Sequence, residues 1–220
     1  AYMMCLKLGF GAPPRMREFS IQHPKTRMYL MEWVYTNHLL KEGVLSPRYE
    51  FINVVFNGTP KGIFSIEEHF SRELIESQKQ REGILLRYDA DPAILSHTFQ
   101  PRFEKSRIEK NDNLRIQYQV AHKLLDDFRN LKKETSRVFD IPITARYLAV
   151  TELWNACHGE IFANIRFYYN PITSLLEPVG YDGATIHPNY LITERDRLCT
   201  FNASEFVLEL LSDKKLAVAF

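Results

Sequence analysis

The chain has 220 residues, of which 45% are hydrophobic and 25% charged, and its formal net charge at pH 7 is +1. This length and hydrophobic content are sufficient for one large domain or for two closely packed lobes. The small net charge argues against a non-specific nucleic-acid binder, which needs a strong basic field, so we expect no nucleic acid among its partners.

Cysteine spacing and hydropathy argue against several other classes. Cys5, Cys157 and Cys199 are far apart and form no C-x-x-C pair, so neither a zinc knuckle nor a disulfide framework is indicated. No apolar stretch reaches the roughly 20 residues that a membrane span requires. The chain opens on the strand-like residues 1–6 without a signal peptide and closes on the apolar run 216–220. We therefore expect the chain to be a fragment of a longer protein, truncated at both ends.

Periodicity and turn residues predict a strand-rich first half. The strongest signal is a hairpin, because β-branched and aromatic residues fill 49–56 and Asn57-Gly58 favours a tight turn before a strand at 63–66. The loop continues through residues 59–62, which leaves its length open. The other elements expected in this half are strands at 5–8, 17–22 and 84–88, a helix at 26–41 and a short helix at 72–80.

The second half is richer in helices. Residues 89–110 are mixed and polar, which is typical of an insertion or a connector between lobes. Apolar residues along one stripe predict a long helix at 112–133. The remaining expected elements are a helix at 144–156, a hairpin of strands 164–169 and 175–181, and a helix at 204–211. The pattern predicts an α+β fold with a cleft between its two halves.

Three ordered stretches carry a more specific pattern. They read PRMREFSI at residues 14–21, FINVVFNG then GIFSIEE at 51–68, and NIRFYYNP then EPVGYD at 164–182. Together they resemble motifs of the CotH-type (spore coat protein H) atypical protein kinases, and the resemblance spans residues 5–185. Arg27 and Glu32 fall on a helix similar to the αC-like element of that family.

The resemblance implies an atypical protein-kinase-like fold of two lobes. Residues 1–110 would form the strand-rich N-lobe-like part and residues 111–220 the helix-rich C-lobe-like part. The implied activity is ATP-dependent phosphoryl transfer to Ser or Thr of a protein, with Mg²⁺ or Mn²⁺ as the metal. Such chemistry depends on positioning and charge neutralisation more than on covalent catalysis. Family members are bacterial and are often linked to spore coats or cell envelopes, which is the location that the resemblance suggests.

Two residues are the expected metal ligands. Asp182 follows a strand and precedes Gly183, and an Asp-Gly pair lets the backbone turn and present the carboxylate. Asn164, just before its strand, would supply a second oxygen, and hard oxygen ligands suit Mg²⁺ or Mn²⁺. The plainer alternatives are a simple turn at Asp182 and a strand-end cap at Asn164.

The expected phosphate-binding cation is an arginine. Arg15 or Arg17, depending on register, replaces the lysine of the family, and its wider, planar group is not equivalent to lysine. Glu68 or Glu32 would be its carboxylate partner. Glu67 and Glu68 lie where a strand ends, so the alternative for both is a solvated helix N-terminus stabilised by the helix dipole.

The catalytic base is the main departure from the family pattern. The family carries a catalytic Asp in the segment that corresponds to residues 155–164, where this chain has none and offers His158 and Glu160 instead. We expect His158 to be the substitute base, because an unperturbed histidine accepts a proton near neutral pH. Its alternative role is structural. The matching alternative for the whole chain is a catalytically inactive kinase-fold scaffold that binds a protein or structural partner.

Overall fold

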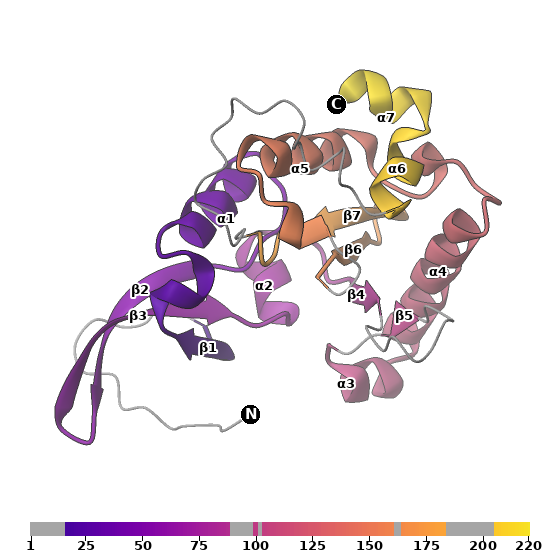
Figure 1. Ribbon diagram of the computed structural model, residues 1–220. Helices are drawn as coiled ribbons and strands as arrows, with labels where there is room; N and C mark the ends of the chain where they lie inside the picture. The colour runs from indigo at the N-terminus through magenta and orange to yellow at the C-terminus, as the bar shows by residue number, and fades with distance from the viewer. Residues whose placement is uncertain (1–15, 89–98, 101–102, 161–163, 184–204) are drawn as a thin grey trace.

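The computed structural model describes residues 16–88, 99–100, 103–160, 164–183 and 205–220 (Figure 1). Within these residues, two small antiparallel sheets are flanked by helices. The mixed α+β class expected from the sequence is thus confirmed. The strand expected at residues 5–8 lies outside the described residues. No helix of the described residues is long and apolar enough to cross a membrane.

The first sheet has the order β1-β3-β2, with β1 at Phe19–Gln22, β2 at Tyr49–Phe56 and β3 at Thr59–Glu68. Asn57 and Gly58 have φ angles of 49° and 78°. Two consecutive positive φ angles are those of a two-residue type I′ turn, whose twist matches the flanking strands. The predicted hairpin is therefore confirmed, and its second strand starts directly after the turn, earlier than expected.

The single helix expected at residues 26–41 is broken in two. A 3₁₀ turn, η1, covers Pro24–Arg27 and helix α1 covers Met31–Lys41. Between them Met28 and Tyr29 have left-handed φ angles of 52° and 59°. Left-handed backbone ends a helical turn, and it is uncommon for side chains of this size. The consequence is that Arg27 lies ahead of α1 on a separate turn of chain.

The second sheet has the order β5-β4-β6-β7 and combines strands from both halves of the chain. Strands β4 and β5 come before residue 110, and β6 and β7 follow it. Leu86 of β4 pairs with Phe167 of β6 in antiparallel register. The strands cover Ile84–Tyr88 (β4), Phe99–Gln100 (β5), Arg166–Asn170 (β6) and Leu175–Val179 (β7).

Side-chain caps determine where the two long helices begin. Asn111 accepts a hydrogen bond from the backbone N–H of Leu114, and Asp140 accepts one from that of Ile143. The cap at Asp140 starts its helix before the expected residue 144, with Pro142 in its first turn. The helices are α2 (Arg72–Ser77), α3 (Lys105–Lys110), α4 (Asp112–Arg129), α5 (Ile141–Leu153), α6 (Glu205–Leu211) and α7 (Lys214–Ala219).

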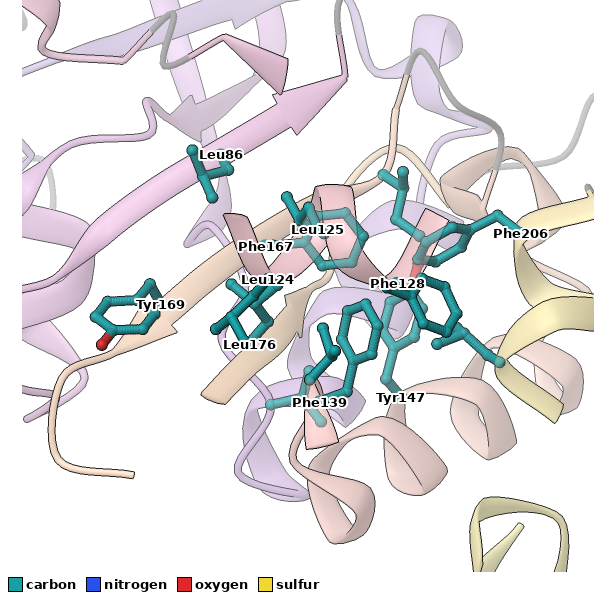
Figure 2. Packing of buried hydrophobic residues seen from close by; sticks show 14 of the residues in the cluster. Leu86, Leu124, Leu125, Phe128, Phe139, Tyr147, Phe167, Tyr169, Leu176 and Phe206 are labelled. Carbon is teal, nitrogen blue, oxygen red and sulfur yellow. The ribbon is translucent and has the colours of Figure 1, made fainter. Parts of the chain in front are cut away.

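The main core lies between the second sheet and helices α4, α5 and α6 (Figure 2). Its centre is a group of four phenylalanines whose ring centroids lie 5.0 to 6.0 Å apart, mostly edge to face, a favourable geometry for aromatic pairs. They are Phe128, Phe139, Phe167 and Phe206, each at most 3% exposed. The other face of the same sheet packs on α2 through a smaller apolar cluster that includes Leu74, Leu85 and Tyr168. The second sheet is therefore covered on both faces.

Candidate functional site

The site is built around Asp182, at the end of the chain segment that leaves β7. Gly180 and Gly183 flank this turn at positions without room for a side chain: a Cβ on Gly180 would lie 2.1 Å from Leu39, and one on Gly183 would lie 2.4 Å from the ring of Tyr35. Both contacts are with α1. The glycines therefore let the segment pass directly against α1, and Asp182 itself takes a φ of 53°.

Glu32 ties this segment to the first turn of α1. Its side chain is fully buried and its Oε1 accepts a hydrogen bond of 2.9 Å from the backbone N–H of Asp182. A hydrogen bond to a charged acceptor is stronger than a neutral one, so this contact holds the backbone at Asp182 firmly. Glu32 was expected to pair with the phosphate-binding cation, and it lies beside the cation that is present.

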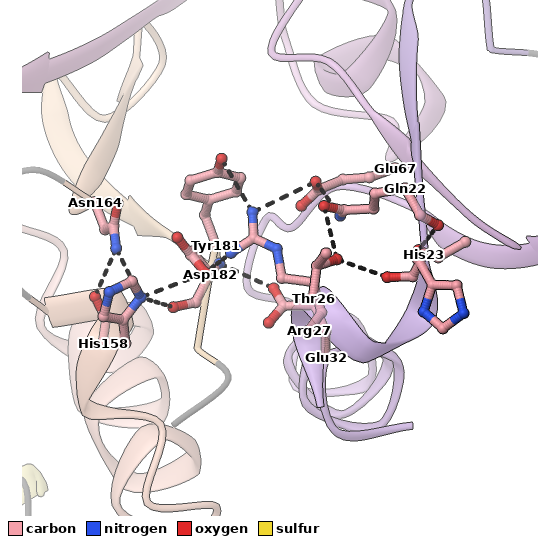
Figure 3. A network of polar contacts seen from close by, with 11 residues as sticks. Gln22, His23, Thr26, Arg27, Glu32, Glu67, His158, Asn164, Tyr181 and Asp182 are labelled. Atoms are coloured by element: carbon pink, nitrogen blue, oxygen red, sulfur yellow. Dashed lines mark hydrogen bonds and ion pairs between the residues drawn. The ribbon is translucent and has the colours of Figure 1, made fainter. Parts of the chain in front are cut away.

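That cation is Arg27 (Figure 3). Its Nη1 pairs with the carboxylate of Asp182, and its Nη2 lies 3.6 Å from Oε2 of Glu67 and donates a 3.3 Å hydrogen bond to the hydroxyl of Tyr181. Burial works against the charge of Arg27, but the carboxylates of Glu67 and Glu32 outweigh it and raise its pKa above the usual value. Arg27 is therefore permanently charged and surrounded by acceptors.

Glu67 lies at the end of β3 and faces Arg27 from the first sheet. Its carboxylate also accepts a 3.1 Å hydrogen bond from Nε2 of Gln22 in β1. Burial raises the pKa of Glu67, and the attraction of Arg27 opposes this without cancelling it. The ion pair is strongest above that raised pKa, where both partners are charged.

His158 and Asn164 complete the site from the other side of Asp182. Nδ1 of His158 lies 3.1 Å from the backbone oxygen of Asp182 and 3.4 Å from its Oδ1. The amide Nδ2 of Asn164 lies 2.9 Å from that same Nδ1 and 3.0 Å from the backbone oxygen of His158. With the ring proton on Nε2, Nδ1 can accept a hydrogen bond from this amide. With the proton on Nδ1, it can donate one to the backbone oxygen of Asp182.

The charge state of His158 follows from its surroundings. Burial lowers its pKa first, and the positive charge of Arg27 lowers it further. The ring is therefore neutral at neutral pH, as a proton acceptor must be. In the tautomer with the proton on Nε2, the lone pair on Nδ1 accepts from Asn164, and His158 then orients the amide of that residue.

Of the two arginines expected at the site, Arg17 does not contribute to these contacts. Arg15 lies outside the described residues. Arg17 lies near α2, where its backbone N–H donates a 2.7 Å hydrogen bond to Glu73, and no contact of the described residues joins it to Asp182. Arg27 takes the place expected for them. The sequence has no local signal for this, because the orientation of Arg27 depends on the unexpected break before α1.

Glu67 and Glu68 point to opposite faces of β3, as successive strand residues do. Glu67 faces Arg27, whereas Glu68 receives a 2.9 Å hydrogen bond from Nε of Arg48. Both are nearly buried, at 6% and 3% exposed, and both lie in a strand. The alternative of a solvated helix N-terminus is thus wrong, and alternation shows why only one of the two can face Arg27.

The donors at the site suit a hard divalent cation in kind. No three His, Cys, Asp or Glu side chains of the described residues gather as a metal-holding group. Mg²⁺, however, is commonly held by one or two protein oxygens with phosphates and waters completing the shell. Asp182 and Asn164 carry a carboxylate and an amide oxygen on either side of His158. The carboxylate of Asp182 pairs with Arg27 in the structure.

A comparison with protein families matches this same region. A family model described as CotH kinase protein matches residues 27–182. The matched segment begins at Arg27 and ends at Asp182, so it contains every described residue of the site except Gln22 and Gly183. No curated protein matches the chain.

Proposed function

Because the chain belongs to the CotH kinase protein family, we propose that it binds ATP with Mg²⁺ or Mn²⁺ and transfers a phosphoryl group to Ser or Thr of a protein. The observation that supports this most is the convergence of Asp182, Asn164 and His158 beside Arg27, which has two buried carboxylates as neighbours. Phosphoryl transfer needs oxygen ligands for a metal, a cation for the phosphates and a proton acceptor. The site holds one candidate for each role.

In this proposal Asp182 and Asn164 hold the metal, which would neutralise charge developing on the phosphates. Arg27 exchanges its contact with Asp182 for the phosphate oxygens, which a guanidinium can bind through two parallel hydrogen bonds. Glu67 keeps Arg27 charged and on the same side of the site. Glu32 holds the backbone of Asp182, so the carboxylate stays oriented while Arg27 moves.

His158 is the proposed base. It is neutral at neutral pH and its Nδ1 lies 3.4 Å from Oδ1 of Asp182, so a substrate hydroxyl brought to the metal would lie near it. To accept a proton at Nδ1 it must give up the hydrogen bond from Asn164. Binding of the Asn164 amide oxygen to a metal would turn that amide and release the bond.

We also propose that the fold has two lobes, as kinases do. The first would carry the sheet β1-β3-β2 with α1, and the second would carry the sheet β5-β4-β6-β7 with the remaining long helices. Strands β4 and β5 then belong with the second lobe although they precede residue 110. The protein substrate or structural partner would lie at a spore coat or cell envelope, in keeping with the family resemblance.

An alternative function is a kinase-fold scaffold that binds a partner without transferring phosphate. Two observations favour it: residues 155–164 contain no Asp, and Arg27 occupies the carboxylate of Asp182. In the scaffold the Arg27–Asp182 pair would be a permanent structural contact between the segment after β7 and the turn before α1. The two functions differ in whether nucleotide and metal displace this pair.

A thermal-shift titration distinguishes the kinase from the scaffold. ATP with Mg²⁺ or Mn²⁺ is added to the parent protein, to Asp182→Asn and to Asp112→Asn, a matched control in which the exposed Asp112 of α4 is changed. A ligand at 100 times its Kd stabilises the fold by about 2.7 kcal/mol. A metal-dependent shift in the parent and control that is absent in Asp182→Asn supports the nucleotide site. No shift in any variant favours the scaffold.

A further inference from the structure

Away from the site, one polar contact joins α1 to the end of α5. Nε1 of Trp154 donates a 2.8 Å hydrogen bond to Nδ1 of His38, and the two rings meet edge to face at 6.1 Å. The side chain of His38 is 30% exposed, so protons from solvent can reach it. This contact lies one residue beyond α5, at the opposite end of α1 from Glu32.

The direction of this hydrogen bond determines the protonation state of His38. The indole Nε1–H of tryptophan can only donate, so Nδ1 of His38 must accept and carry no proton. The ring is then neutral, with its proton on Nε2. A doubly protonated imidazolium has two donors and no acceptor, and it cannot make this contact.

A carboxylate is available for the protonated ring. Oε1 of Glu42, one turn further along α1, lies 3.8 Å from Nε2 of His38. Glu42 attracts the imidazolium, whereas Trp154 can donate only to the neutral ring. The other charged residues next to the pair in sequence are Lys41 on α1 and Glu152 on α5. Protonation therefore breaks a contact between two helices and strengthens one within a single helix.

A second hydrogen bond across this interface does not depend on pH near neutrality. The hydroxyls of Tyr35 on α1 and Thr151 on α5 lie 3.1 Å apart and are buried. Burial raises the pKa of Tyr35 above its usual value, so the hydroxyl keeps its proton near neutral pH. Loss of the His38 contact would thus loosen one end of the interface while Tyr35 and Thr151 hold the other.

We propose that His38 and Trp154 form a proton-operated latch between α1 and α5. At neutral pH the latch is closed, with neutral His38 bound to Trp154. On acidification His38 pairs with Glu42, and the end of α1 separates from α5. Helix α1 also carries Glu32, which holds the backbone of Asp182. Movement of α1 would therefore also displace the backbone of Asp182. The latch itself does not depend on the proposed kinase function.

The test follows the indole N–H of Trp154 by ¹⁵N–¹H NMR from about pH 8 to about pH 5, the range in which histidine changes charge. The chain has two tryptophans, and Trp154→Phe assigns their resonances. The exposed Trp33 on α1 is the internal reference. We expect the Trp154 resonance to move upfield in a single titration step and its exchange with water to accelerate, while Trp33 stays in place.

Three variants isolate His38. In His38→Gln the amide oxygen accepts from Trp154 without titrating, so the resonance should remain at its hydrogen-bonded position at every pH. In Glu42→Gln the Trp154 resonance should still change with pH, because its hydrogen-bond partner is His38. His122→Gln, on α4, should titrate like the parent. A Trp154 resonance that does not move in the parent, or that moves equally in His38→Gln, overturns the latch.

Discussion

Arg27 and Asp182, the first and last residues of the segment matched by the family model, form an ion pair at the centre of the site. The side chains are only 12% and 16% exposed, so both charges are largely removed from water. Each charge is compensated by the other, and Arg27 also by Glu67, while Glu32 holds the backbone N–H of Asp182. The stability and the chemistry of this region therefore depend on one guanidinium.

Replacing that guanidinium should be costly. Arg27→Gln leaves Glu32, Glu67 and Asp182 close together without a buried cation, and breaking a buried ion pair from one side costs about 3 to 5 kcal/mol. We expect a loss of about 3 kcal/mol at pH 7, because the pair keeps some exposure. Urea unfolding measures this loss in the free energy of unfolding. Arg115→Gln, which removes an exposed pair with Asp112, is the control and should cost at most about 1 kcal/mol. Equal losses would contradict this account.

Glu160 should make the protein less stable as pH rises. It is 2% exposed, and burial, with a smaller effect of Glu152, raises its pKa from 4.5 to about 8. Between those two values the folded state binds more protons than the unfolded state, so the free energy of unfolding falls with increasing pH. Above pH 8 the fold must hold a buried carboxylate.

Glu160→Gln should remove this dependence. We expect the variant to exceed the parent in stability by roughly 2 to 4 kcal/mol at pH 9, since each pKa unit corresponds to about 1.4 kcal/mol. The difference should be small at pH 4.5. Urea unfolding at both pH values provides the measurement, and Glu109→Gln on the exposed face of α3 is the control. A constant difference between the parent and Glu160→Gln at both pH values would show that Glu160 does not titrate as described.

His158 has two possible roles, and a single substitution can distinguish them. A general base contributes about 10²- to 10⁴-fold to a rate, and its loss does not weaken ligand binding. His158→Ala should therefore lower kcat by that factor and leave the metal-dependent thermal shift with ATP intact. If His158 only orients Asn164, the thermal shift should weaken as well, because the second metal ligand loses its support.

The aromatic core should be sensitive to loss of Phe206. This residue is 1% exposed and contacts Phe128, Phe139 and Phe167, so truncation leaves a cavity. Phe206→Ala should cost about 3 to 5 kcal/mol, as measured by urea unfolding. Leu208→Ala in the same helix is the control: Leu208 is 55% exposed and should have little effect. A small loss for Phe206→Ala would mean that α6 does not pack on the core as the structure indicates.

Much of the local structure was predictable because it depends on neighbouring residues. Asn57-Gly58 supplies the two positive φ angles of the hairpin turn, and the strand at 84–88 was correct at both ends. The break between η1 and α1 was missed because Met28 and Tyr29 carry no signal for left-handed backbone. The start of α5 was missed because the cap at Asp140 precedes its apolar pattern.

Periodicity, turn chemistry and ordered motifs identified most of the elements, the α+β class and the family, because they are properties of neighbouring residues. The sequence also identified Asp182, Asn164, His158 and Glu32, which the tertiary structure brings together. The identity of the cation that faces Asp182 could not be inferred from neighbouring residues. That identity depends on how η1, β3 and the segment after β7 pack, and the charge of a buried arginine is stabilised only where distant carboxylates meet it.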